Sequence, residues 1–257
     1  MASLSASTAQ CELDCLAWLA LTLTPALGAK RIVDAVAKLD APGQIFELPL
    51  TGLEALHLPA EAAQFIFDGK ARAAAEAEYT VAQAGNARLV TLTSEEYPER
   101  LKEIYDPPPV LWVRGDHQLL QSAAIAVVGT RHPSPYGTGV AEMLSRDLAA
   151  RGLLIVSGMA RGIDTCAHKG ALAARKPTLA IWGTGIDVVY PKENKKLAED
   201  ILSTGGAIVS ELPAGTFPDG LAVLPRELPA APAMPWVCGG SCSGVRVTLS
   251  TPPLWAN

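Results

Sequence analysis

The chain has 257 residues and a formal net charge of −5, with 49% hydrophobic and 18% charged residues. This composition fits a soluble globular protein of one large or two modest domains and excludes a disordered chain. The negative balance also excludes a surface that is basic throughout, so any site for a polyanion must be a local patch.

Residues 1–82 are predicted to form a small helical domain. Leu16, Leu19 and Leu23 recur at helical spacing, and residues 60–77 consist largely of Ala and Glu with almost no β-branched residues. These patterns indicate several short helices.

Gly28 permits a tight turn between the first two of these helices, and Lys30 and Arg31 open the second. In helix-hairpin-helix modules a glycine turn of this kind presents backbone amides to a DNA phosphate. The other interpretation is a helix–helix corner with two solvated cations, which neighbouring acidic residues such as Glu12 and Asp34 favour.

Cysteine usage and hydropathy indicate the compartment. The five cysteines have no His or Cys partners at metal-ligand spacing, which predicts reduced thiols and no bound metal. The apolar segment 15–27 is short, contains Pro25 and has no preceding Lys or Arg. We therefore expect neither a signal peptide nor a membrane span, and a cytoplasmic protein.

Residues 83–218 are predicted to form an α/β domain in which strands alternate with helices. The first helix of its core carries Val140, Met143, Leu144 and Leu148 on one face. Such alternation predicts a parallel sheet with right-handed crossovers, whose ligands bind beyond the carboxyl ends of the strands. The strand-like runs are residues 88–93, 110–114, 124–129, 153–157, 178–182 and 207–210.

The loop after the run 124–129 holds the strongest candidate site, Gly129-Thr130-Arg131. It lacks the G-x-G-x-x-G spacing of a dinucleotide site and places a cation there instead, so a nicotinamide cofactor is disfavoured. Arg131 can fork two donors onto a phosphate, and Thr130 can add a hydroxyl. The alternative for Arg131 is a salt bridge that closes the loop.

The next loop repeats this pattern with small residues and a second arginine. Ser157, Gly158, Ala160 and Gly162 allow a backbone to approach a ligand closely. Arg161 either extends a basic strip along the sheet edge or pairs with an acid, for which Asp164 is the candidate.

Polar residues farther along have competing interpretations. We expect Asp164 to cap the following helix and His168 to be a packed helix residue rather than a ligand. Lys176 ends that helix, where it stabilises the negative pole, and it also suits a DNA backbone. Asn194 either caps the next helix or contacts a nucleotide, and capping is favoured.

No catalytic set emerges from the sequence. There is no serine with a positioned histidine and acid, no metal-ligand cluster and no paired glutamates in a shared motif, so we expect a binding protein and no enzyme. Tyr136, Trp182 and Tyr190 are the aromatic residues near the candidate loops, and we expect each to serve packing rather than base stacking.

Four motifs in order carry a resemblance to a known family. Residues 128–137, 156–168, 183–194 and 209–213 resemble, in sequence and spacing, those of the DprA/Smf family of DNA-processing proteins. The resemblance extends over roughly residues 15–218. It implies an extended Rossmann-like fold behind a small SAM-like helical domain, and a homodimer.

The resemblance implies a protein that binds single-stranded DNA, protects DNA that enters by natural transformation and loads the RecA recombinase on it. It implies no cofactor. It also implies that Lys176 binds DNA, because a lysine at this place in the family resembles a binding residue. The predicted DNA- and phosphate-binding residues are Gly129, Thr130, Arg131, Ser157, Gly158, Ala160, Arg161, Gly162, Lys176 and Asn194.

Residues 219–257 depart from the family pattern. Five prolines between 218 and 235 forbid a regular helix and disfavour a central strand. Either a reading-frame change altered this tail, which predicts a weakened dimer, or the tail is a divergent natural terminus. Two other functions stay open: a nucleotide or nucleoside-monophosphate hydrolase of the LOG type, whose Pro-Gly-Gly-x-Gly-Thr loop is absent, and an inactive truncated family member.

Overall fold

The computed structural model describes residues 2–217 and 245–250, with side chains from residue 10 to residue 217. The chain forms two compact units, which divide between Leu111 and Trp112. They are called the helical unit and the α/β unit below. The predicted domain boundary between residues 82 and 83 stays a prediction.

Helices make up most of the helical unit, as the Ala- and Leu-rich spacing predicts, although the first, with 21 residues, is longer than the expected short helices. They are α1 (Ala2–Thr22), α2 (Ala29–Val36), η1 (Pro42–Glu47), α3 (Leu50–Ala55), α4 (Ala60–Phe67) and α5 (Lys70–Ala84), followed by β1 (Ala87–Thr91) and α6 (Glu99–Lys102). Leu19 and Ile32 are buried in its core, and the indole N–H of Trp18 donates to Thr93 Oγ1 at 2.9 Å.

The turn before α2 differs from its prediction. Ala26, with φ 57°, takes the left-handed conformation, while Gly28 has an ordinary φ of −80°. Lys30 pairs with Asp34 one helical turn later, at 2.7 Å. This pairing agrees with the interpretation of a helix–helix corner with solvated cations.

The sheet has the strand order β1-β2-β6-β5-β4-β3-β7. Its four central strands, β3 (Ala124–Gly129), β4 (Leu154–Ser157), β5 (Thr178–Trp182) and β6 (Ala207–Ser210), are parallel. The predicted α/β, Rossmann-like architecture is confirmed in these strands. The strands on either side of this parallel core run the other way: β2 (Val110–Gly115) is antiparallel to β6, and β7 (Val245–Ser250) is antiparallel to β3.

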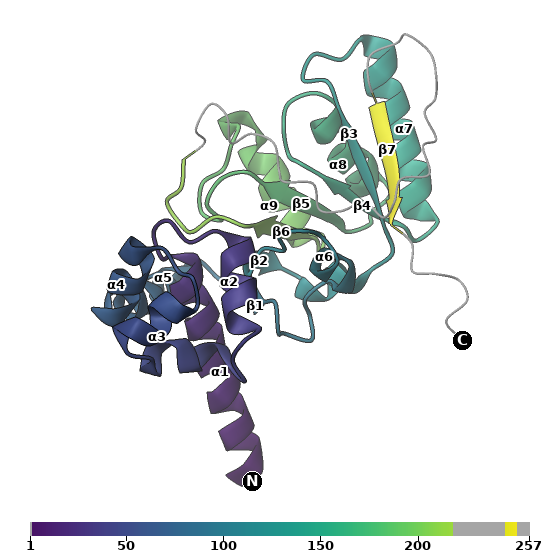
Figure 1. Ribbon diagram of the computed structural model, residues 1–257. Helices are drawn as coiled ribbons and strands as arrows, with labels where there is room; N and C mark the ends of the chain where they lie inside the picture. The colour runs from purple at the N-terminus through teal and green to yellow at the C-terminus, as the bar shows by residue number, and fades with distance from the viewer. Residues whose placement is uncertain (1, 218–244, 251–257) are drawn as a thin grey trace. The chain divides into compact units, whose positions relative to one another are not determined.

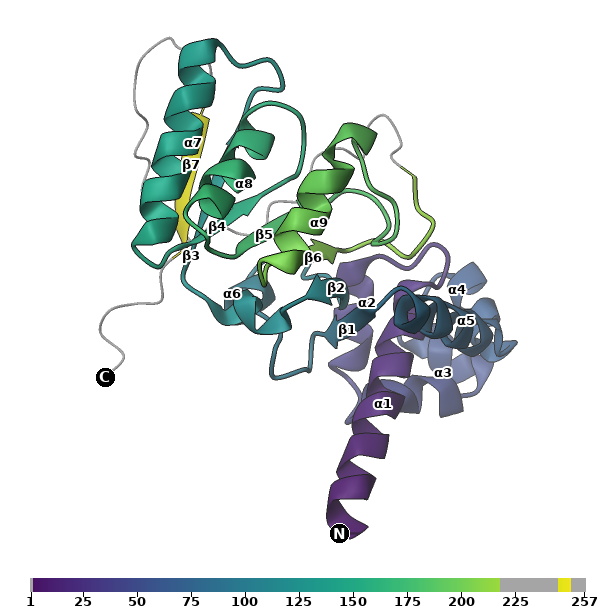
Figure 2. The same cartoon turned by 180° about the vertical axis from the view of Figure 1, so that it is seen from behind.

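Three helices connect the parallel strands: α7 (Pro135–Ala150), α8 (Ile163–Ala173) and α9 (Lys195–Ser203). The strands step across the sheet in one direction, β3, β4, β5, β6, so right-handed crossovers place all three helices on the same face. Figures 1 and 2 show this arrangement from both sides. Each helix therefore begins at the carboxyl edge of the sheet. The short helices η2 (His117–Gln121) and η3 (Lys192–Asn194) lie in the connections.

The face that α7 buries is not the predicted one. Val140, Leu144 and Leu148 are half-buried and Met143 is 51% exposed. The side chains it buries are small: Gly137, Ala141, Ser145 and Ala149.

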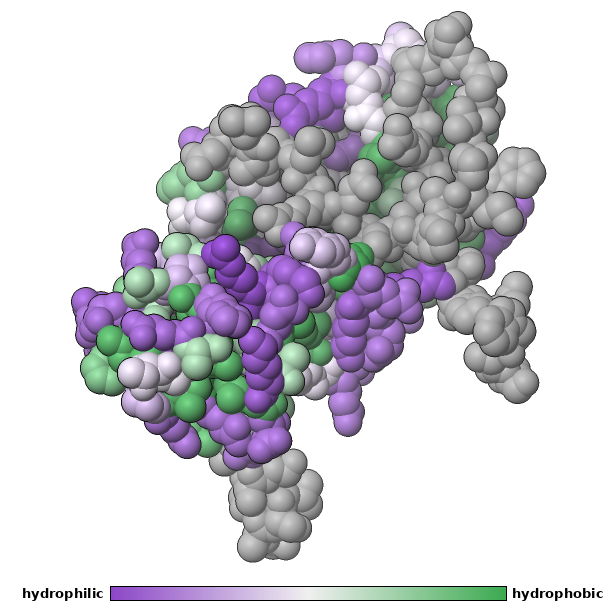
Figure 3. Space-filling model, viewed as in Figure 1, coloured by the Kyte–Doolittle hydropathy of each residue, from purple (hydrophilic) through white to green (hydrophobic). Residues whose placement is uncertain are grey.

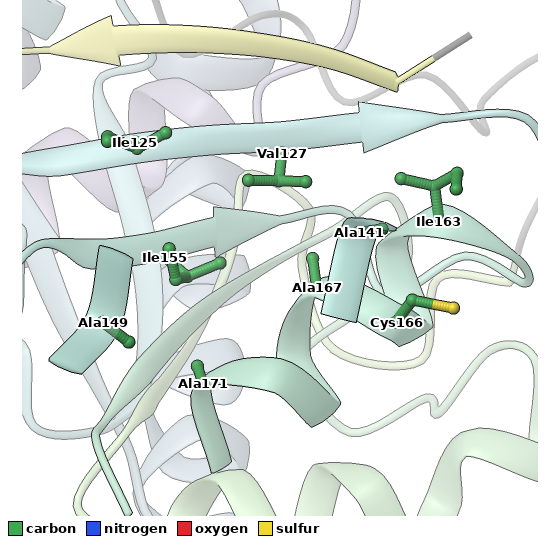
Figure 4. Packing of buried hydrophobic residues seen from close by; sticks show 9 residues of the cluster. All are labelled: Ile125, Val127, Ala141, Ala149, Ile155, Ile163, Cys166, Ala167 and Ala171. Atoms are coloured by element: carbon green, nitrogen blue, oxygen red, sulfur yellow. The ribbon is translucent and has the colours of Figure 1, made fainter. Parts of the chain in front are cut away.

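Close packing of α7 against α8 explains why the buried face of α7 consists of small residues. A Cβ at Gly170 of α8 would lie 2.4 Å from the carbonyl oxygen of Glu142, so the two helices touch through their backbones. Figure 4 shows Val127 and Ile155 of the sheet beside small side chains of both helices, such as Ala141 and Ala167. Larger residues on this face would hold the helices apart.

The predicted divergent tail lies mostly outside the described residues, which leave out 218–244 and 251–257. Its proline-rich part is among those residues. The described segment of the tail is β7, which pairs along the whole of β3 from Ala124↔Ser250 to Gly129↔Val245. A strand at this position was not predicted.

Candidate nucleic-acid interface

Three loops lie side by side at the carboxyl edge of the α/β unit. They follow the neighbouring strands β3, β4 and β5 and comprise residues 129–134, 158–162 and 183–194, which we call the rim. Their predicted placement at one edge of the sheet is confirmed by the strand order.

The first two loops of the rim are in direct backbone contact. The Ile163 N–H donates to the Thr130 carbonyl oxygen at 3.2 Å. Gly162 has a φ of +79°, and a Cβ there would lie 2.3 Å from that same oxygen and 2.9 Å from Arg131 Cα. The glycine is therefore needed both for its backbone conformation and for the approach of the loop that carries Arg131.

Asp164 lies beneath these two loops and holds them from inside. It is only 7% exposed, and its Oδ2 accepts from the Ala160 N–H at 3.3 Å. Burial raises the pKa of its carboxyl group, while hydrogen bonds from the amides of Ala160, Gly129 and Gly158 and the charge of Arg131 oppose that rise. Backbone amides of both loops thus point to an internal carboxylate.

The predicted capping role of Asp164 is wrong. Gly162 is the N-cap of α8 and makes no side-chain cap. Asp164 sits within the first turn of the helix, where its side chain turns back to the preceding loop instead of forward. The amides of Gly129, Gly158 and Ala160 thus serve this internal carboxylate rather than an external anion.

Arg131 is the exposed cation at this point of the rim. Within residues 10–217 it forms no ion pair, so the loop-closing salt bridge is absent there, and its charge acts on the buried Asp164. Thr130 Oγ1 accepts from the His132 N–H at 3.2 Å, which leaves its hydroxyl proton available as a donor. The pair offers a guanidinium and a hydroxyl to one ligand.

Arg161 pairs with Glu193 of the third loop, so the alternative of a pair with Asp164 is wrong. The hydrogen bond lowers the pKa of Glu193 and raises that of Arg161. Both side chains are more than half exposed. Exposed ion pairs are weak and screened by salt, so a phosphate can compete for this arginine.

Two predicted site residues have buried side chains that brace the loops. The Ser157 hydroxyl donates to the Val127 carbonyl oxygen at 2.7 Å. Asn194 is 7% exposed and its Nδ2 donates to the Met159 carbonyl oxygen at 2.8 Å and to Thr165 Oγ1 at 2.9 Å. Asn194 stands at the N-cap of α9 but makes no capping bond, so the capping prediction is wrong. A DNA contact by either residue stays a prediction.

Lys176 is not brought to the rim. It precedes β5, whose carboxyl end forms the rim, and is thus at the opposite edge of the sheet. From Lys176 to Gly183 the strand advances by roughly 20 Å at the usual rise per residue. Its role as a binding residue stays a prediction.

Sequence reasoning missed a group of cations at the start of α9. Lys192, Lys195 and Lys196 are all exposed and follow the third loop of the rim. Lysines in the first turn of a helix oppose the helix dipole, so they do not stabilise α9. That mismatch is the signal that could have revealed them in the sequence.

The distribution of charge separates the two units. Residues 1–111 contain 15 Asp and Glu against 8 Lys and Arg, whereas residues 112–217 contain 9 acidic against 11 basic residues. Figure 3 shows hydrophilic side chains interspersed with apolar ones over the described part of the helical unit on that face. Net charge therefore disfavours a polyanion at the helical unit and does not disfavour one at residues 112–217.

His168 is fully buried, as predicted for a packed histidine. Its Nδ1 lies 2.9 Å from Thr178 Oγ1, whose hydroxyl donates to the Ile155 carbonyl oxygen at 2.7 Å. Thr178 therefore accepts from an Nδ1–H. Burial lowers the pKa of His168 to about 4, so the ring is neutral at pH 7.

The pH dependence of stability should report this burial. The unfolded chain protonates His168 near its ordinary pKa of 6.5 and the folded chain only near 4, so the free energy of unfolding falls as the pH drops through that window. The loss attributable to this residue should be at most about 3 kcal/mol. Denaturant unfolding at pH 7 and pH 4.5 measures it: His168→Leu should flatten the dependence, while replacing the exposed His132 by Gln should not. Equal pH dependence of parent and His168→Leu would contradict this assignment.

In the described part of the chain, no three His, Cys, Asp or Glu side chains come together in a group able to hold a metal ion. Over the same residues, no helix has the length and apolar character needed to cross a bilayer.

Comparison with known proteins places this fold and rim in a family. A family model described as DNA recombination-mediator protein A matches residues 88–227, a little over half of the chain. The chain belongs to this family. The match covers the sheet from the second residue of β1 to the end of β6 and the whole rim, so the predicted DprA/Smf membership is confirmed.

The similar proteins agree with the family. Protein Smf of Escherichia coli is 41% identical over 133 residues, which is 52% of this chain and 36% of that protein. DNA processing protein DprA of Streptococcus pneumoniae is 40% identical over 151 residues, 59% of this chain and 50% of that protein. Its crystal structure matches with a TM-score of 0.66 at 30% identity, over 78% of this chain and 69% of that one. The matched segments thus span a third to a half of the length of these curated relatives.

Proposed function

We propose that this chain binds single-stranded DNA along the rim and acts as a DNA-processing protein in recombination, without catalysing a reaction. Arg131 carries the proposal: it is an exposed guanidinium at the carboxyl edge of a parallel sheet, without an ion pair in residues 10–217. Parallel sheets bind their ligands at this edge, and a free arginine there suits a phosphate.

The wider role follows from the family. As a member, the chain is proposed to protect DNA taken up in natural transformation, to hand it to the RecA recombinase and to act as a homodimer. A strand of phosphates suits the rim better than a single nucleotide does, because Arg131, Arg161 and Lys192 lie on three successive loops. Cations spread in this way can neutralise several phosphates of one strand.

Fluorescence anisotropy with labelled oligonucleotides tests the proposal. Affinity should rise with length for single-stranded DNA, exceed that for a duplex of equal length and fall with rising salt, since released counterions contribute to binding. A nucleoside monophosphate added in molar excess over the oligonucleotide should not displace it and should not be hydrolysed. Turnover of the monophosphate, or no binding to any oligonucleotide at low salt, would contradict the proposal.

A further inference from the structure

Exposed aromatic side chains of the α/β unit collect at its carboxyl edge. Within residues 112–217 they are Tyr136 (73% exposed), Tyr190 (42%) and Phe217 (72%), which follow β3, β5 and β6. Trp112 and Trp182, by contrast, are buried in the sheet. Single exposed apolar residues are common, but aromatic rings confined to one edge beside cations indicate a binding surface.

Tyr136 stands on the first loop's helix, five residues after Arg131. It is the second residue of α7, whose start is fixed by Pro135 and by Ser134 Oγ, which accepts from the Gly137 N–H at 3.1 Å. The ring therefore projects from a rigid element that begins directly after the loop carrying Arg131. The expectation that Tyr136 serves packing is contradicted by its 73% exposure.

Tyr190 lies on the third loop of the rim, which also binds the second arginine. Arg161 reaches this loop through its ion pair with Glu193, which stands three residues after Tyr190. Lys192 follows two residues after Tyr190. Each exposed tyrosine thus belongs to a loop of the rim that carries a cation, or to the helix that begins directly after one.

We propose that Tyr136 and Tyr190 form a base-stacking subsite that takes the nucleobases of a single strand whose phosphates are held by the neighbouring cations. The inference rests on the proposed function and adds the part of the ligand that arginines cannot bind. Aromatic rings beside a basic track are the usual arrangement for a single strand, because every base offers a π face to a ring. In a duplex the bases are already stacked and cannot reach these side chains.

The test compares two oligonucleotides of equal length and charge, one with normal bases and one with abasic sugars at its central positions. Tyr136→Ala and Tyr190→Ala should each weaken binding of the normal strand by about 5- to 150-fold and leave binding of the abasic strand unchanged. Tyr136→Phe should bind like the parent, because the ring is kept. Tyr105→Ala, which removes an 80% exposed tyrosine from the helical unit, is the matched control and should bind both strands like the parent.

The results separate this inference from the proposed function. Tyrosine variants that bind the normal strand like the parent, or lose affinity for both strands equally, would overturn the stacking subsite. If Arg131→Ala still weakens binding of both strands in that case, phosphate binding at the rim stands alone. If the parent binds neither strand, both proposals fail. Thermal melting of each variant confirms that the chain is folded.

Discussion

Gly162→Ala is expected to destabilise the α/β unit by about 3 kcal/mol, from backbone strain and overpacking together. The new Cβ would stand 2.3 Å from the Thr130 carbonyl oxygen and 2.8 Å from the Arg131 carbonyl carbon, both backbone atoms that cannot rotate away. The φ of +79° adds strain for any residue with a side chain. Denaturant unfolding followed by circular dichroism measures the loss.

Gly139→Ala is the matched control. Gly139 is exposed in the interior of α7, and a Cβ there would meet no atom within 4 Å. Alanine should leave stability unchanged or raise it by up to about 1 kcal/mol, because it favours a helix over glycine. A Gly162→Ala variant as stable as the parent would show that the first two loops of the rim are not packed as described.

Arg131→Ala is expected to weaken binding of single-stranded DNA by about 1–3 kcal/mol, or roughly 5- to 150-fold, the size of one charge-assisted contact to a phosphate. The loss should be the same for strands of different base sequence, since phosphates carry no sequence information. Arg131→Lys should recover only part, because an ammonium cannot reproduce the two-pronged guanidinium contact. Equilibrium titration by fluorescence anisotropy measures each affinity.

Arg151→Ala controls for the loss of one positive charge. Arg151 is exposed at the end of α7, at the sheet edge opposite the rim, and its guanidinium donates to the Asp147 carbonyl oxygen. Removing it should change the affinity little. Equal effects of the two substitutions would mean that only net charge matters and that Arg131 has no special position.

The sequence predicts the architecture well because the strands and helices have clear periodicity. The runs at 124–129 and 178–182 become β3 and β5 with correct bounds, and the loops after them meet at one edge. The buried face of α7 could not be predicted in the same way. Small residues are needed on that face because the backbone of α8 at Gly170 lies against α7. This contact joins segments that are distant in the sequence.

For the polar residues of the site, too, the sequence predicts the positions but not the tertiary partners. Arg131 and Arg161 could be placed on the rim from their strands, but the partner of Arg161 is Glu193, 32 residues away. Asp164 resembles a capping residue in the sequence, whereas burial turns its carboxylate to amides of two loops. Exposure, which separates Tyr136 from Trp182, is a tertiary property that hydrophobicity alone does not reveal.

The salt dependence of binding tests the central claim most directly. Affinity for a single strand should be measured for the parent and for Arg131→Ala at several salt concentrations, and the logarithm of the association constant plotted against that of the salt concentration. If Arg131 neutralises one phosphate, the variant's slope should be shallower by roughly 0.7. A folded variant with the same affinity and slope as the parent would contradict phosphate binding by Arg131 at the rim.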